Sequence, residues 1–189
     1  MEFLVLGITG KRGSGKDTMA EYLKATYGFR VLTYTDDVLA PILKAKGREV
    51  TRENLISLAL EMRAASGRHI LTKLMCDKID LDGLWAISGV RYPEEVGYFK
   101  ERFGDAFKLV KIECSIENRH ERVVLRGTKG EAGMTMRKFM EIEEKETEKM
   151  INETIRLADF SLDNDGKLDE FYRRIDELAK MLGISKASR

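Results

Sequence analysis

A continuous apolar run that leads through a glycine-rich loop into a helical pattern constrains the fold of this chain most strongly. Residues 3–8 (FLVLGI) are apolar without alternation, which predicts a strand buried on both faces of a parallel sheet. Glycines recur in residues 10–15, and from Lys16 the apolar positions Met19 and Leu23 follow helical spacing. A strand, a tight loop and a helix in this order are typical of a βα unit.

The remainder of the chain alternates in the same way. We predict further strands at 29–35, 84–90, 107–114 and 158–164. We predict helices at 16–27, 37–46, 51–65, 70–79, 116–126, 135–156 and 167–182, with another that begins at Pro93. This alternation indicates a three-layer α/β fold, in which a five-stranded parallel sheet has helices on both faces. The 189 residues suit a single domain, with insertions at about 37–82 and 127–140.

Composition excludes several classes of function. The net charge is only +1, and basic and aromatic residues do not interleave, so we expect no nucleic-acid partner. The apolar stretches are too short to span a membrane, and no basic leader precedes the first of them. Cys76 and Cys114 are isolated and predict free thiols in a reducing compartment, so we expect a cytoplasmic protein. The composition does not indicate an oligomeric state.

The loop after the first strand matches the phosphate-loop motif G-x-x-x-x-G-K-[ST] at Gly10, Gly15 and Lys16. Glycines let successive backbone N–H groups converge on phosphate oxygens, and the following helix and Lys16 add positive charge. The strand before the motif and the helix after it are the context that this motif requires. The expected contacts to a bound nucleotide come from Gly10, Lys11, Arg12, Gly13, Ser14, Gly15, Lys16, Asp17 and Thr18.

The motif departs from its usual form at Asp17, which stands where a hydroxyl normally holds magnesium. A carboxylate about 4 Å from a phosphate charge is repelled by roughly 4 kcal/mol at an effective dielectric near 20. A divalent cation would remove that penalty, and Mg²⁺ accepts carboxylate ligands. We therefore predict that Asp17 holds Mg²⁺, with Thr18 as a nearby oxygen. In the alternative interpretation Asp17 points away and pairs with Lys11 or Arg12.

The acidic residue that ends the neighbouring strand in many phosphate-loop proteins, the Walker B residue, is also missing. Ser88 and Gly89 occupy its place. This absence favours Asp17 or Asp36 as the source of the carboxylate.

Polar side chains follow the second and third predicted strands. Asp36 lies beyond a carboxyl end, where open α/β sheets bind ligands, and it either orients the acceptor or caps a helix. Arg91 follows the third strand and suits an acceptor phosphate, or it forms a surface salt bridge with Glu94 or Glu95. Arg63 in the 37–82 insertion either contacts the acceptor or lies on the surface.

Three arginines share one face of the predicted helix 116–126. Arg119, Arg122 and Arg126 recur at i, i+3 and i+7, which places their guanidinium groups together. Such a cluster predicts a grip that closes on phosphate. The alternative is a solvated face, on which the arginines pair with Glu117 and Glu121.

These motifs resemble the P-loop kinases of nucleotides and other small phosphorylated metabolites. The segments GKRGSGKDT and ISGVRYPEEV resemble deoxynucleoside monophosphate kinases, except that Gly89 replaces the Asp of the second motif. The segments RVVLRG, EEKE and ADFSLDNDGKLDEF are similar to dephospho-CoA kinase and its archaeal, adenylate-kinase-related relatives. The resemblance implies that Arg122 and Arg126 are lid arginines and that Asn164 and Gly166 lie beside adenine. It also implies that residues 37–82 bind the acceptor and that 127–140 form a lid. The arginine that these relatives often carry after the second strand is absent from DDVLAPI.

Together these features predict a kinase that transfers the γ-phosphoryl group of ATP, with Mg²⁺, to a (deoxy)nucleoside monophosphate, dephospho-CoA or a similar small acceptor. Lys16, Asp36, Arg122 and Arg126 are the expected catalytic residues, while Asp36, Arg63 and Arg91 are expected to contact the acceptor. The alternative is an ATPase or nucleotide-dependent switch that acts on a protein partner. The base-reading Asn-Lys-x-Asp motif of many GTP switches is absent.

Overall fold

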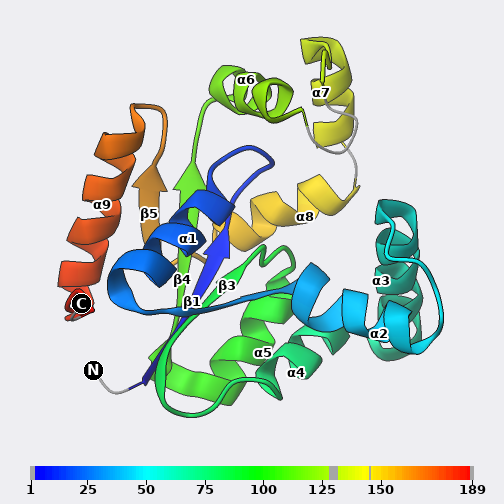
Figure 1. Ribbon diagram of the computed structural model, residues 1–189, viewed down its shortest axis with the longest axis horizontal. Coiled ribbons are helices and arrows are strands. Elements are labelled where there is room, and N and C mark those ends of the chain that lie inside the picture. Colours follow the sequence, from blue (N-terminus) through cyan, green and yellow to red (C-terminus); the bar gives the residue numbers. More distant parts are fainter. Residues whose placement is uncertain (1–2, 128–131, 145, 188–189) are drawn as a thin grey trace.

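The computed structural model describes residues 3–127, 132–144 and 146–187. Its five strands form one parallel sheet in the order β2-β3-β1-β4-β5, with helices on both faces (Figure 1), and this confirms the predicted fold class. The strands are β1 (Phe3–Thr9), β2 (Arg30–Thr33), β3 (Gly83–Ser88), β4 (Phe107–Glu113) and β5 (Phe160–Asp163).

The helices follow the predicted alternation along most of the chain. They are α1 (Lys16–Tyr27), the π-helix η1 (Tyr34–Leu39), α2 (Ala40–Ala45), α3 (Arg52–Ser66), α4 (Ile70–Cys76), α5 (Pro93–Phe103), the 3₁₀ turn η2 (Gly104–Ala106), α6 (Ile116–Arg126), α7 (Met136–Glu143), α8 (Glu146–Ile155) and α9 (Leu168–Met181). None of these helices combines the length and the apolarity needed to cross a membrane.

The central strand β1 divides the core into two layers. Leu4 and Leu6 pack with α1 and α9 on one face, while Val5 packs with α4 and α5 on the other. Gly7 faces the same side of the sheet as Val5, and a Cβ added to it would lie 2.9 Å from the Phe107 ring. Burial on both faces explains why the β1 sequence lacks the polar alternation of a half-exposed strand.

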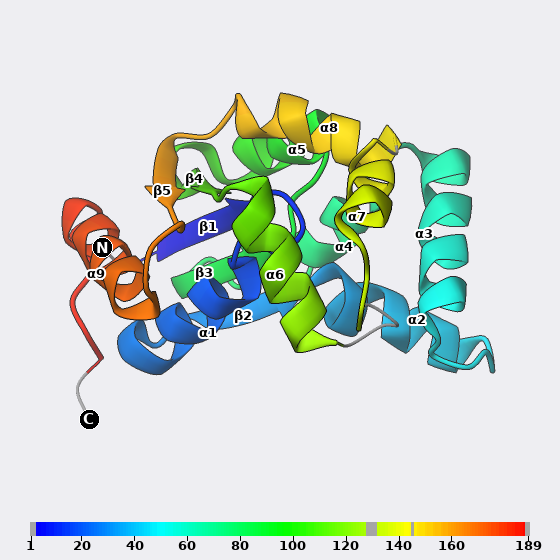
Figure 2. The same ribbon diagram turned by 90° about the horizontal axis from the view of Figure 1, so that it is seen from above.

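The carboxyl ends of the parallel strands meet at one edge of the sheet. Ile8 in β1 pairs with Ser88 in β3, and Ser88 is level with Thr33 in β2. The loops that follow these three strands therefore open at the same edge. In Figure 1 this is the upper edge, over which α6 and α7 lie, and Figure 2 looks down on it.

The helix predicted at 37–46 begins earlier than expected. Thr33 caps the helix by accepting a hydrogen bond from the Asp36 N–H at 3.0 Å. The Asp37 carboxylate accepts a hydrogen bond from the Thr33 N–H at 2.6 Å. These two bonds start a π-helix at Tyr34, which continues into α2. Figure 1 shows α2 and α3 at the side of the sheet away from α9.

The prediction of one long helix at 135–156 is wrong, because α7 and α8 are separate helices. Phe139 in α7 is fully buried and contacts the His120 ring, whereas Ile151 in α8 is buried on the main body of the fold. The first helix ends at Glu143, with Glu144 as its C-cap, and the second begins at Glu146. Residues 128–131 of the predicted lid lie outside the described part of the chain.

Candidate functional site

The loop between β1 and α1, residues 10–15, is held in a shape that glycine alone adopts without strain. Gly10, Gly13 and Gly15 have φ values of 144°, 79° and 104°. A Cβ at Gly10 would lie 2.7 Å from the Ile112 carbonyl oxygen, and a Cβ at Gly13 would lie 2.6 Å from that of Arg119. The backbone of this glycine loop therefore presses directly on the end of β4 and on α6.

The glycine loop leaves the start of α1 open. Gly15 is the N-cap and supplies no side-chain hydrogen bond to the first turn. The free N–H groups of a helix start attract anions. The Lys16 ammonium bridges the loop, donating to the Gly10 carbonyl oxygen at 2.8 Å and to that of Lys11 at 2.9 Å. The loop thus brings a positive charge and a helix start without a side-chain cap to one place, which is an arrangement that suits a polyphosphate.

The Asp17 carboxylate contacts the end of β3. It accepts a hydrogen bond from the Ser88 hydroxyl at 3.0 Å, and Ser88 is buried. Asp17 itself is exposed at the edge of the sheet, with Thr18 half-buried beside it. The contact joins the two positions at which the sequence departs from the usual phosphate-loop pattern.

Asn164 supports the glycine loop from the side of β5. It is buried, its side-chain amide donates to the Ser14 carbonyl oxygen at 2.7 Å, and its backbone N–H donates to Glu113 O at 2.8 Å. A Cβ at Gly15 would overlap the same amide. The structure therefore gives Asn164 a positioning contact to the loop, while Gly166, two residues later, is exposed beside Glu170.

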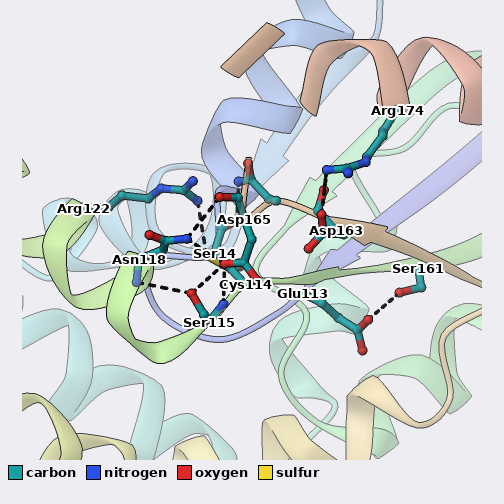
Figure 3. Close-up of polar contacts among 11 residues, drawn as sticks. Ser14, Glu113, Cys114, Ser115, Asn118, Arg122, Ser161, Asp163, Asp165 and Arg174 are labelled. Atoms are coloured by element: carbon teal, nitrogen blue, oxygen red, sulfur yellow. Dashed lines mark hydrogen bonds and ion pairs between the residues drawn. The ribbon is translucent and has the colours of Figure 1, made fainter. Parts of the chain in front are cut away.

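Asp165 ties the loop after β5 to the start of α6 (Figure 3). Its carboxylate accepts from the Ser115 N–H at 2.7 Å, the Ser115 hydroxyl at 2.6 Å and the Asn118 amide at 2.8 Å. These donors, the Ser115 hydroxyl above all, hold the pKa of Asp165 well below its usual range. The site-side ends of β4 and β5 are thereby fixed to each other.

Replacement of Asp165 with asparagine is expected to flatten the acid dependence of stability. A carboxylate with a lowered folded-state pKa stabilises the fold above its unfolded pKa, about 3.9, and that contribution is lost as pH falls toward the lower value. Wild type should therefore lose more of its urea midpoint between pH 5 and pH 2.5 than Asp165→Asn does. Because Asp165 is exposed, the two proteins should differ by less than about 1 kcal/mol in the unfolding free energy that they lose over this pH range. Asp105→Asn, in the exposed turn η2, is the matched control. Equal losses in wild type and Asp165→Asn would contradict the prediction.

The three arginines of α6 do not act as one cluster. Arg119 is buried, with its guanidinium 2.9 Å from Glu143 and donating to the carbonyl oxygens of Cys114 and Arg12. It therefore supports the glycine loop, and the expectation that all three arginines grip phosphate is wrong for Arg119. Arg122 is half-buried and donates to Cys114 Sγ at 3.3 Å, and Arg126 is exposed.

Glu143 at the end of α7 links the predicted lid to the glycine loop. Besides its ion pair with Arg119, it lies 3.6 Å from the Lys11 ammonium, and its side chain is 10% exposed. Its second oxygen, Oε1, is buried without a hydrogen-bond partner in the described part of the chain. The position of α7 is thus coupled to the loop through charged side chains.

The acceptor-side candidates surround the neighbouring strand ends. Asp36 is exposed after β2 and accepts from the Thr33 hydroxyl at 3.0 Å, so Thr33, not Asp36, caps the helix. Arg91 follows β3 and is half-buried, and its backbone N–H donates to Glu95 at 2.9 Å. Arg63 on α3 donates to Glu95 at 3.1 Å and stacks over a tyrosine ring. The strand-end register brings Asp36 and Arg91 to the edge that also carries Asp17.

Glu95 is the buried centre of this side of the site. It is fully buried, and burial raises the pKa of its carboxyl group above the ordinary value, although the Arg91 N–H, Arg63 and the Tyr92 N–H act in the opposite direction. Its Oε2 accepts from the N–H groups of Arg91 and Tyr92 at 2.9 and 3.3 Å. The carboxylate therefore fixes both the start of α5 and Arg63 on α3.

Curated relatives identify the family of the chain. A UPF0200 protein of Sulfurisphaera tokodaii is 31% identical over 180 residues, which cover 94% of this chain and 97% of that protein. The chain belongs to the UPF0200 family. A UPF0200/UPF0201 protein of Archaeoglobus fulgidus is also 31% identical over 182 residues, but this UPF0200 chain spans 55% of the length of that relative. No family model matches the chain.

Solved structures resemble this UPF0200 chain in fold. Shikimate kinase from Bacteroides thetaiotaomicron superposes with a TM-score of 0.63 at 13% identity, covering 96% of this chain and 99% of that one. A gluconokinase from Sinorhizobium meliloti superposes with a TM-score of 0.54 at 13% identity, covering 95% of each chain. At this identity the likeness establishes the P-loop kinase fold.

Sequence reasoning missed several residues that shape the site of this UPF0200 chain. Glu95 had a signal, because it stands three residues after the N-cap Tyr92, the spacing at which Glu returns to the N-cap backbone. Asp165 belongs to a segment that was singled out for its neighbours Asn164 and Gly166. Glu143 had no signal, because its partners come from the glycine loop and from α6.

A glycine substitution tests the packing of the loop against α6. Gly13→Ala is expected to lose about 1–2 kcal/mol of unfolding free energy from the left-handed backbone and about 1–3 kcal/mol more from overlap with the Arg119 carbonyl. Gly47→Ala is the control, because Gly47 has φ 66° and open space around its Cβ position. Urea unfolding measures both losses. The prediction is contradicted if the Gly13 variant loses no more than the Gly47 variant.

Proposed function

We propose that this chain is a kinase that transfers the γ-phosphoryl group of ATP to a small phosphorylated metabolite. The observation that carries the proposal is the glycine loop, where three glycines with positive φ, an uncapped helix start and the Lys16 ammonium meet. Phosphoryl transfer depends on positioning and charge neutralisation, which such a loop supplies. The fold shared with shikimate kinase and a gluconokinase supports a small-molecule acceptor.

The donor binds through the glycine loop in this proposal. The N–H groups from Gly13 to Thr18 surround the phosphates, and the Lys16 ammonium moves from the loop carbonyls to the β- and γ-phosphate oxygens. Lys11 and Arg12 flank the same phosphates. The adenine end lies beside Gly166, and Asn164 acts by holding the loop through the Ser14 carbonyl oxygen.

The residues present fit a magnesium ion that arrives with the nucleotide. Asp17 offers an exposed carboxylate at the start of α1, beside Ser88 and Thr18, and Mg²⁺ typically takes one or two carboxylates together with substrate phosphates. The ion would neutralise charge on the transferring phosphoryl group. The role of the chain is to hold the carboxylate where a phosphate-bound ion can reach it.

Arg122 and Arg126 close the donor side in this proposal. Both lie on α6, which passes over the glycine loop at the upper edge of the sheet in Figure 1. Arg122 is anchored near Cys114, and Arg126 is exposed near the end of the helix. Their guanidinium groups stabilise the charge that develops during transfer.

The acceptor binds at the ends of β2 and β3. Asp36 accepts a hydrogen bond from the attacking group where that group is a hydroxyl, as in dephospho-CoA, and Arg91 pairs with the acceptor's own phosphate. Arg63 forms the outer wall, held in place by Glu95. A (deoxy)nucleoside monophosphate and dephospho-CoA are the first acceptors to test, because both carry a phosphate that Arg91 would bind.

Phosphorus NMR with ATP, Mg²⁺ and a panel of nucleoside monophosphates and dephospho-CoA tests this function. We expect a new phosphorus resonance with one acceptor, at the expense of ATP: a phosphoanhydride if a nucleoside monophosphate is the acceptor, or a phosphoester if the hydroxyl of dephospho-CoA is. Asp36→Asn should slow its formation, while Asp105→Asn, in the exposed turn η2, should not. Inorganic phosphate alone, released equally with and without acceptor, would contradict the kinase and favour an ATPase or switch that acts on a protein partner.

A further inference from the structure

Two positions at the site carry residue types opposite to those of other phosphate-loop proteins. In P-loop NTPases the ion is generally held by the loop Ser or Thr after the lysine and by a Walker B Asp. Here the residue after Lys16 is Asp17, and β3 ends with Ser88. A carboxylate and a hydroxyl are both present, but the carboxylate follows the lysine and the hydroxyl ends the strand, with Gly89 next in the chain.

The two side chains contact each other directly. The Ser88 hydroxyl donates to Asp17 Oδ1 at 3.0 Å. Ser88 is 6% exposed, and its backbone is fixed on both sides by parallel pairing with Ile8 and Thr33. A rigid strand therefore sets where the hydroxyl lies, and the hydroxyl in turn limits where the Asp17 carboxylate can point.

From this contact we infer that Asp17 and Ser88 replace the usual magnesium-binding pair, with the carboxylate and the hydroxyl exchanged between the helix and the strand. Ser88 is the positioning residue that orients Asp17 toward a nucleotide-bound Mg²⁺. The inference rests on the proposed function, since it assigns a geometry to the donor site. The exchange conserves one carboxylate and one hydroxyl at the edge of the sheet. It also explains how a carboxylate can stand next to bound phosphates, because a divalent ion held there would offset the repulsion between the two negative charges.

The ion is bound together with the nucleotide and not before it. Within the part of the chain that the structure describes, no group of three or more His, Cys, Asp or Glu side chains could hold a metal. One carboxylate and one hydroxyl are too few ligands for six-coordinate Mg²⁺ unless phosphate oxygens and waters complete the shell. Mg²⁺ alone should therefore show no measurable binding in titration calorimetry, whereas it should strengthen ATP binding.

The exchange is tested by reversing it. We compare wild type, Asp17→Ser, Ser88→Asp and the double variant Asp17→Ser/Ser88→Asp by titration calorimetry of ATP in Mg²⁺ and in EDTA. Asp17→Ser removes the carboxylate, and Ser88→Asp places two carboxylates within contact, so each should lose about 10- to 100-fold of the Mg²⁺-dependent affinity. The double variant restores the usual order and should recover to within about threefold of wild type.

The positioning role of Ser88 has a separate readout. Ser88→Ala should weaken ATP binding in Mg²⁺ by about tenfold and leave binding in EDTA unchanged, because only the orientation of the carboxylate is lost. Ser88→Thr keeps the hydroxyl and should retain the wild-type effect of Mg²⁺. Ser161→Ala is the matched control, since Ser161 on β5 also donates to a carboxylate, Glu113 at 3.0 Å.

The outcomes separate this inference from the proposed function. If wild type binds ATP and the double variant binds no better than either single variant, the exchange is wrong and nucleotide binding stands. A Ser88→Ala variant with an unchanged Mg²⁺ effect would also overturn the role of Ser88. Absence of ATP binding by wild type, with or without Mg²⁺, would overturn both.

Discussion

Replacing Lys16 with alanine is expected to lower kcat/KM for phosphoryl transfer by about 10²- to 10³-fold, the loss typical of removing one fixed charge-stabilising donor. The Lys16 ammonium is held at 2.8 Å from Gly10 O and 2.9 Å from Lys11 O, directly across the glycine loop. Nothing else on α1 carries a positive charge at that point, because the other basic residue of the helix, Lys24, lies in its last turn. The variant should lose transition-state stabilisation that no neighbour on the same helix replaces.

Lys24→Ala provides the matched control for Lys16. It removes the same side chain from the same helix at an exposed position, so its rate should stay within about twofold of wild type. The rate is measured by phosphorus NMR with whichever acceptor the panel identifies, and urea unfolding checks that both variants are folded. Transfer by Lys16→Ala within about threefold of wild type would remove Lys16 from the mechanism.

Glu95→Ala is expected to cost about 3–5 kcal/mol of unfolding free energy, the range for breaking a buried ion pair by removing one partner. Glu95 is fully buried, and its two oxygens accept from the N–H groups of Arg91 and Tyr92 and from Arg63. The variant leaves two N–H groups at the start of α5 without their acceptor. It also leaves Arg63, whose side chain is 15% exposed, without its carboxylate partner.

Glu94→Ala is the control for this loss. Glu94 precedes Glu95 in the same helical turn, but its side chain is 45% exposed and pairs at 3.2 Å with Arg68, which is 43% exposed. Such surface pairs contribute about 0–1 kcal/mol. Urea midpoints of the two variants should differ accordingly, and similar midpoints would show that the buried pair does not hold α3 to α5.

Much of the fold follows from local patterns in the sequence. The five strands and most helices were predicted because an apolar run and a helical period are properties of short segments. The error at 135–156 arose because α7 and α8 share one helical pattern while Phe139 and Ile151 are buried against different surfaces. The helical spacing of the apolar residues can be read from the sequence, but the surface against which each of them packs cannot.

The site was predictable where its residues lie next to each other in the chain. The glycine loop, Lys16 and Asp17 form one continuous motif. In contrast, Arg119 was grouped with Arg122 by helical spacing, and its partner Glu143 lies 24 residues later on α7. The sequence shows that Ser88 stands where an acidic residue is usual. Its hydrogen bond to Asp17 spans 71 residues, however, and follows only from the register of β3 with β1.

The most direct test of this account is titration calorimetry of the wild-type protein with ATP, in Mg²⁺ and in EDTA. We expect saturable binding of one ATP per chain in Mg²⁺, with affinity weakened by about tenfold or more in EDTA, since Asp17 then faces the phosphates without an intervening cation. Adenosine, which lacks phosphates, should bind far more weakly. A protein with no measurable heat of ATP binding in either buffer, at protein and nucleotide concentrations up to the millimolar range, would contradict the assignment of the glycine loop as a nucleotide site.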